Sequence, residues 1–144
     1  VISPKSNFHA VPWRTALMVG AGPAMATTLV LFCSHFHQIN QDAAVGKKSP
    51  LVILGTHRAA EFLPWLVGLI FLLELLPVLI GIWPITTLIC LISLPSGIDL
   101  IKLIKRHHNQ PERIKNSKFL ALRFQTINGL CLSIGFAISS FFYN

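Results

Sequence analysis

Charged residues are scarce in this chain, and acidic residues are the scarcest. Only 12% of the 144 residues are charged and five are acidic, whereas 53% are hydrophobic. A soluble domain carries roughly a quarter charged residues, so this balance indicates a membrane protein. The basic residues cluster in loops between apolar runs, as the cytoplasmic loops of membrane proteins do, and this pattern argues against a nucleic-acid partner.

Cysteine is also rare, and its placement excludes two common roles. Cys33, Cys90 and Cys131 stand in separate apolar runs, without the spacing of a zinc motif or a disulfide framework. We interpret them as small packing residues. The sequence begins without methionine and shows no signal-peptide pattern, so we expect a processed or partial chain.

Four long apolar runs dominate the rest of the chain, at about 13–36, 59–80, 82–104 and 119–143. A helix rises about 1.5 Å per residue, so each run can cross a hydrocarbon core of about 30 Å. Backbone polar groups cannot stay unpaired in lipid, so each run should be helical. We therefore predict an all-α polytopic transmembrane bundle with four spans, in which residues 1–144 form a single transmembrane segment. The basic loops 37–58 and 105–118 should share one side of the membrane.

A polar segment between the first two runs carries the groups best suited to chemistry. On a helix that continues out of the first run, His35, Gln38 and Asp42 lie on one stripe, and Gly46 then ends the helix before Lys47. Magnesium prefers oxygen ligands, and cations stabilise a leaving diphosphate. The segment therefore fits a metal-bound diphosphate. It also fits a solvated helix end followed by ordinary cytoplasmic lysines, and that alternative stays open at this point.

The same segment resembles the second aspartate-rich motif of the UbiA superfamily of intramembrane prenyltransferases, in its MenA-type branch. The form typical of naphthoquinone phytyltransferases, HFHQ-x-x-x-D-x-x-x-GK-x-SP, is matched from His35 to Pro50. The stretch from His107 to Leu130 resembles the C-terminal region of the same branch. The general motif has two acids four residues apart, and here Gln38 occupies the first position.

The resemblance implies a fold and a reaction. The fold has about nine spans, and this chain resembles its C-terminal portion, without the first aspartate-rich motif of the N-terminal half. The reaction transfers a phytyl or polyprenyl group from its diphosphate to 1,4-dihydroxy-2-naphthoate, in phylloquinone or menaquinone biosynthesis. It takes place in a cyanobacterial plasma or thylakoid membrane, or in a plastid membrane. We expect this chain to need the N-terminal half for activity.

The resemblance also implies Mg²⁺ as cofactor and three kinds of site residue. These are the metal ligands Asp42 and Gln38, the diphosphate-binding Lys47 and Lys48, and the possible pocket-lining His35 and Asp99. Two non-enzymatic interpretations stay open: a four-span membrane subunit or transporter fragment that binds cations structurally, and an inactive truncated relic.

Three further polar residues lie inside the apolar runs. Glu74 is deep in the second run, where a charge is costly, so it marks either a functional site or a hydrogen bond between helices. Gln125 and Asn128 are three residues apart in the fourth run, and we predict that they join helices by hydrogen bonds.

Overall fold

A computed structural model describes residues 13–142, and within that range the chain is helical with no strand. The elements are α1 (Trp13–Ala44), α2 (Pro50–Leu54), α3 (Thr56–Leu79), the 3₁₀ helix η1 (Ile85–Ser93), α4 (Leu94–His107), α5 (Pro111–Ile114) and α6 (Ser117–Phe142). Four segments are long and apolar enough to cross a membrane: Ala16–Ala44, Thr56–Leu79, Ile85–His107 and Pro111–Phe142. The predicted four-span all-α fold is therefore confirmed. Residue 143, the predicted end of the last span, lies outside the described residues.

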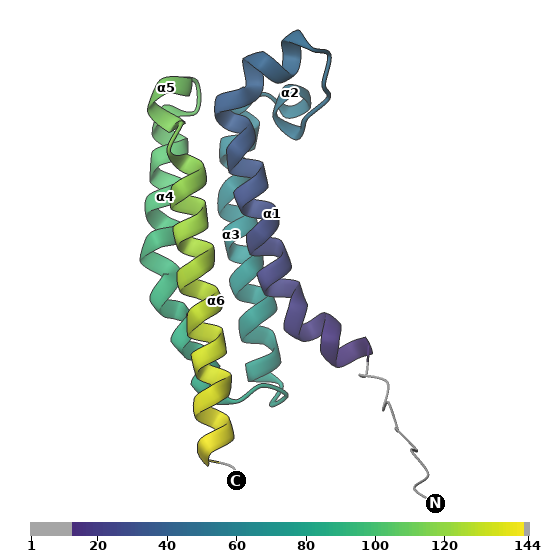
Figure 1. The fold of residues 1–144 in the computed structure, drawn as a ribbon, viewed down its shortest axis with the longest axis vertical. Helices are drawn as coiled ribbons and strands as arrows, with labels where there is room; N and C mark the ends of the chain where they lie inside the picture. Colours follow the sequence, from purple (N-terminus) through teal and green to yellow (C-terminus); the bar gives the residue numbers. More distant parts are fainter. Residues whose placement is uncertain (1–12, 143–144) are drawn as a thin grey trace, which may run out of the picture.

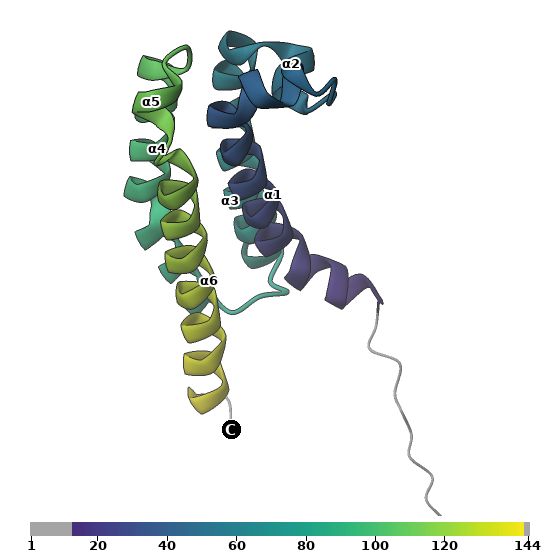
Figure 2. The ribbon, with the colours of Figure 1, turned by 45° about the horizontal axis from the view of Figure 1, so that its top comes forward.

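The long helices form two neighbouring pairs. Figure 1 shows α1 beside α3 and α4 beside α6, and the turned view in Figure 2 shows the same pairing. The short helices α2 and α5 lie at one end of the bundle, whereas the connection from α3 to η1 lies at the other end (Figure 1). The two basic loops thus share one end, which is the arrangement that the alternation of loops predicts.

The core lies where the two pairs meet. Large side chains from all four long helices are fully buried there, among them Leu29, Phe36, Leu63, Leu100 and Phe124. Many other large apolar side chains are exposed on the outer faces of the same helices, as expected for surfaces that contact lipid. The first residues of α1, from 16 to 20, are exposed, and this end of the helix diverges from the bundle (Figure 1).

The third span begins as a 3₁₀ helix, which the apolar pattern alone does not predict. Within α4, Pro95 has no N–H to donate to the carbonyl of Leu91, so a continuous α-helix would lose a hydrogen bond there. η1 also packs tightly on α6. A Cβ on Gly135 would lie 2.7 Å from the Thr86 carbonyl oxygen, and the Thr86 hydroxyl donates to the Gly135 carbonyl at 2.6 Å. This close contact favours the thinner 3₁₀ geometry.

Two glycines turn the chain back against the end of α1. α1 continues past its apolar part to Ala44, and Gly46 and Gly55 then adopt φ of 71° and 77°. Such positive values favour glycine because it has no Cβ. Between the two glycines lies α2, a short helix absent from our sequence prediction, whose Leu51 is fully buried in the core. The turn brings residues 47–49 to the end of α1, where the candidate site lies.

Candidate functional site

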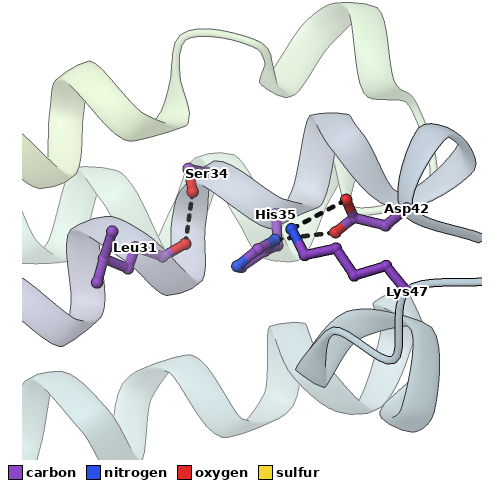
Figure 3. A network of polar contacts seen from close by, with 5 residues as sticks. All are labelled: Leu31, Ser34, His35, Asp42 and Lys47. Atoms are coloured by element: carbon purple, nitrogen blue, oxygen red, sulfur yellow. Dashed lines mark hydrogen bonds and ion pairs between the residues drawn. The ribbon is translucent and has the colours of Figure 1, made fainter. Parts of the chain in front are cut away.

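Asp42 is the centre of a small polar network at the end of α1, drawn in Figure 3. The residue is only 7% exposed although it lies near the rim of the bundle. One carboxylate oxygen, Oδ2, lies 3.0 Å from Nδ1 of His35, two helical turns earlier on the same helix. The other, Oδ1, accepts a hydrogen bond from Nζ of Lys47 at 3.3 Å. The helical stripe of His35 and Asp42 therefore exists as the spacing predicted.

The turn at Gly46 explains how Lys47 reaches this carboxylate. The amide of Lys47 donates to the carbonyl of Asp42 at 2.8 Å, which closes the last turn of the helix and fixes the backbone beside the site. A helix would have carried residue 47 to a different face than residue 42. The positive φ of Gly46 redirects the chain instead, and the lysine side chain returns to the acid.

Ser49 is a further member of the site that our sequence analysis did not assign. Its side chain is only 3% exposed and lies near the Asp42 carboxylate. Its hydroxyl is a hydrogen-bonding neighbour of the Asp42 carboxylate, and it does not cap α2. Buried hydroxyls are nearly always paired, and here the Asp42 carboxylate is the acceptor within reach. Its place in the matched motif was the one signal in the sequence that pointed to it.

The other predicted site residues lie outside the hydrogen-bond network of Asp42. Gln38 is half-buried on α1, and Lys48 is exposed next to Lys47. Asp99 is exposed on α4. These three side chains make no hydrogen bond or ion pair within residues 13–142. The structure therefore assembles His35, Asp42 and Lys47, whereas it does not bring Gln38, Lys48 or Asp99 into that network.

The donor set fits a magnesium ion only in part. Across the described part of the chain, no three His, Cys, Asp or Glu side chains are grouped closely enough to hold a metal ion. Magnesium in phosphate-binding sites, however, uses one or two carboxylates together with water and phosphate oxygens. Asp42 supplies one such carboxylate. Its partners in the structure are the nitrogen groups of His35 and Lys47.

Positive charge gathers at the same end of the bundle. The loops and the adjoining helix ends at this end of the bundle contain eight basic residues: Lys47, Lys48, Arg58, Lys105, Arg106, Arg113, Lys115 and Lys118. A cluster of one sign raises the local concentration of ions of the other sign. The rim is therefore suited to attract an anion, while the apolar helices below it are suited to lipid chains.

A second polar network lies deep inside the bundle. The Asn128 amide of α6 donates to Glu74 Oε2 of α3 at 2.9 Å and to the Ser93 hydroxyl at 3.3 Å. Nearer the surface, Gln125 donates to the Thr27 hydroxyl of α1 at 2.7 Å. The prediction that Gln125 and Asn128 join helices is confirmed, and Glu74 takes the helix-joining role.

A helical segment with four membrane-length spans and a basic rim defines an integral-membrane protein. No protein-family model matches the chain, and no solved structure matches it significantly. The chain is 38% identical over 112 residues to the 2-carboxy-1,4-naphthoquinone phytyltransferase of Synechocystis sp.. The aligned region covers 78% of this chain and 36% of that protein. The chain is 40% identical over 114 residues to the chloroplastic 2-carboxy-1,4-naphthoquinone phytyltransferase of Arabidopsis thaliana, covering 78% of this chain and 30% of that protein.

The chain is similar to the C-terminal portion of these two phytyltransferases. It spans about a third of the length of the curated relatives that it matches. The resemblance to the prenyltransferase family inferred from the sequence is thus confirmed.

Proposed function

We propose that this chain forms the part of a phytyltransferase that holds the diphosphate end of a prenyl diphosphate. The reaction would transfer a phytyl or similar polyprenyl group to 1,4-dihydroxy-2-naphthoate in phylloquinone or menaquinone biosynthesis. One observation carries the proposal: a buried carboxylate, Asp42, lies at the basic rim of an apolar bundle and within hydrogen-bonding reach of Lys47. The names of the relatives supply the phytyl donor and the naphthoquinone acceptor.

Several residues of this chain would hold the diphosphate, each through a different contact. Lys47 is close enough to the site to donate hydrogen bonds to a phosphate oxygen, and exposed Lys48 is a second candidate for the same role. Asp42 would hold a magnesium ion, helped by Gln38 on the same helix stripe. When bound, magnesium neutralises charge on the diphosphate and stabilises it as a leaving group.

The remaining roles follow from the surroundings of the site. His35 would line the pocket beside Asp42, and Asp99 would border it from α4. The apolar helices would shelter the prenyl tail in the bilayer. On the acceptor, the ring carbon that bears the carboxylate forms the new bond to the prenyl carbon, and the carboxylate then leaves as CO₂.

The site needs more carboxylates than this chain brings together. We infer that they come from an N-terminal portion like that of the relatives, with a first aspartate-rich motif. The host membrane would be a cyanobacterial plasma or thylakoid membrane, or a plastid membrane, since the matched relatives come from a cyanobacterium and a chloroplast.

The test is complementation between this chain and the N-terminal portion of a relative. The chain would be expressed in membranes alone and together with the N-terminal portion of the Synechocystis relative. Magnesium-dependent transfer from phytyl diphosphate to 1,4-dihydroxy-2-naphthoate would then be measured. We expect product only when both parts are present, and none with Asp42→Asn. Product formation that is unchanged in Asp42→Asn, or unchanged when magnesium is removed, would contradict the proposal.

One observation favours a second candidate function. Both oxygens of Asp42 already have partners within the chain, as they would in a non-catalytic four-span subunit whose acid merely ties the helix end to the following loop. That alternative, like an inactive relic, predicts no transfer with the complementing portion. It also predicts that Asp42→Asn loosens the loop without any effect on magnesium binding.

A further inference from the structure

A small polar cavity lies between the start of α3 and the end of α4, at the basic end of the bundle. Its volume is about 110 Å³, and its lining residues are His57, Ala60, Glu61, Lys105 and His108. None of these residues belongs to α1, to α2 or to the turn between them. The cavity is therefore a second polar site, separate from the Asp42 network.

Contacts between the two helices hold the histidines of this cavity in place. The Thr56 hydroxyl lies 3.1 Å from Nδ1 of His108, and the rings of His57 and His108 meet edge to face with their centroids 5.4 Å apart. These contacts join the first residues of α3 to the end of α4, more than 50 positions further along the chain. The imidazoles beside the cavity are thus positioned before any ligand binds, which lowers the cost of binding.

Two opposite charges in the cavity lack partners within residues 13–142. Glu61 and Lys105 both line it, both are exposed, and neither forms an ion pair or a side-chain hydrogen bond there. A ligand that carries both an anionic group and a hydroxyl donor could contact the ammonium and the carboxylate together. The basic residues gathered at this end of the bundle favour a ligand with net negative charge over a zwitterion.

An apolar groove follows on the same helix, further from the rim. Its volume is about 610 Å³, and it is lined by Pro64, Trp65, Gly68, Leu69 and Leu72. Trp65 is 76% exposed, as tryptophans near a membrane surface often are. A Cβ on Gly68 would meet nothing within 4 Å, so this glycine leaves an open notch in the surface of α3. The groove is suited to an acyl chain.

The cavity and the groove share one face of α3. His57, Glu61, Trp65, Gly68 and Leu72 are separated by four, four, three and four residues, so they form a single helical stripe, here called the α3 stripe. From Glu61 to Leu72 the helix rises roughly 16 Å, which is about half of a hydrocarbon core of about 30 Å. The α3 stripe therefore runs along one leaflet, with its polar end at the headgroups.

We propose that the α3 stripe binds a membrane phospholipid with an anionic, hydroxyl-bearing headgroup of the phosphatidylglycerol type. The phosphate contacts Lys105 beside the two imidazoles, and a glycerol hydroxyl donates to Glu61. One acyl chain lies along Trp65 and the notch at Gly68. This inference goes beyond the proposed function and does not depend on it, because the diphosphate is assigned to the Asp42 network and the lipid to a different face.

The headgroup is tested by quenching of tryptophan fluorescence, with the full chain in liposomes that contain lipids with brominated acyl chains. Subtracting the signal of Trp65→Phe isolates Trp65. Brominated phosphatidylglycerol should bind about fivefold more tightly than brominated phosphatidylcholine, as expected for one lysine near an anionic lipid. Lys105→Gln should abolish this preference, whereas Lys115→Gln removes the same charge outside the cavity and should keep it. No preference in the full chain, or equal loss in both variants, would overturn the proposal.

The glycerol hydroxyl is tested with phosphatidylmethanol, which has the same charge as phosphatidylglycerol but no headgroup hydroxyl. The full chain should prefer phosphatidylglycerol about threefold, the effect of one hydrogen bond. Glu61→Leu should remove this difference while both anionic lipids still bind more tightly than phosphatidylcholine. Equal binding of the two anionic lipids to the full chain would overturn the assigned headgroup. Circular dichroism would establish that each variant keeps its helices.

The acyl-chain groove is tested by filling its notch. Gly68→Leu has room for the new side chain, and the phosphatidylglycerol retained through purification should fall at least about twofold, because the chain loses apolar contact area. Mass spectrometry of the extracted lipid measures the amount, and unchanged retention would contradict the groove. Relief of Trp65 quenching by added phytyl diphosphate would show a substrate site instead of a lipid site, and it would leave the proposed function standing.

Discussion

Two carboxylates of this chain are buried to a similar degree, yet their surroundings differ completely. Glu74 is 1% exposed in the middle of the bundle. It accepts a hydrogen bond from the uncharged Asn128, and Gly22 packs closely against its side chain. Asp42 is near the rim, and its partners are nitrogen groups that carry or can carry positive charge. Burial alone therefore does not identify a functional acid. The charge of its partners and its distance from the rim separate an acid that joins helices from one that can bind ions.

The sharpest test of this comparison exchanges each acid for its amide. In the complemented enzyme, Asp42→Asn should lower phytyl transfer about 100-fold or more, since one charged group that stabilises a leaving group is typically worth that much. Glu74→Gln keeps the shape and the hydrogen-bonding capacity at the inner site, so the rate should change by less than about threefold, as expected for a group outside the chemistry. Initial rates of product formation decide the matter. Similar losses in the two variants would erase the distinction.

The inner network is broken most directly at Asn128. Asn128→Ala leaves Glu74 without its hydrogen-bond donor inside the bundle, so the free energy of unfolding should fall by about 1–3 kcal/mol. Titration with sodium dodecyl sulfate, followed by circular dichroism, measures that change. A double-mutant cycle with Glu74→Gln isolates the coupling between the two side chains. A coupling energy near zero would mean that the contact is incidental.

A smaller effect is expected from Gly22, which lets α1 approach Glu74. A Cβ at this position would lie 2.7 Å from Cγ of Glu74, so Gly22→Ala should cost about 1–2 kcal/mol of unfolding free energy through overpacking. Gly20→Ala is the matched control, because nothing lies within 4 Å of its Cβ position. The same denaturant titration serves for both. Gly22→Ala should lose its penalty in a Glu74→Ala background, and a penalty that persists there would point to a different clash.

The smallest effect is expected at the exposed hydrogen bond between α6 and α1. Gln125→Ala removes the donor to the Thr27 hydroxyl, and hydrogen bonds between membrane helices average about 0.6 kcal/mol. The unfolding free energy in micelles should change by about that amount. A loss as large as that of Asn128→Ala would show that depth in the bundle does not govern the strength of these contacts.

The sequence predicted the features that follow from helical periodicity and hydropathy. Four apolar runs became four membrane-length segments, and the spacing of His35 and Asp42 placed them within contact on one helix. Local rules suffice here, because in lipid the backbone has little choice but to form a helix. The catalytic and binding roles assigned to the site residues remain predictions.

Other features depend on contacts that periodicity does not contain. The return of Lys47 to Asp42 depends on the backbone at Gly46, and the burial of Ser49 depends on how α2 packs. The 3₁₀ geometry of η1 depends on the close approach of Gly135, which is 49 residues from Thr86. Such features depend on the turn geometry and tertiary packing of the folded chain.

The 3₁₀ stretch also changes how far the third span reaches. The nine residues of η1 rise roughly 18 Å at about 2.0 Å per residue, and the fourteen of α4 add roughly 21 Å at about 1.5 Å per residue. The combined length, roughly 39 Å, is that of an α-helix of about 26 residues, although the segment has 23. A hydrocarbon layer of about 30 Å is therefore crossed with several ångströms to spare. The surplus carries Lys105 and Arg106, in the last turn of α4, clear of the acyl chains and into the headgroup layer.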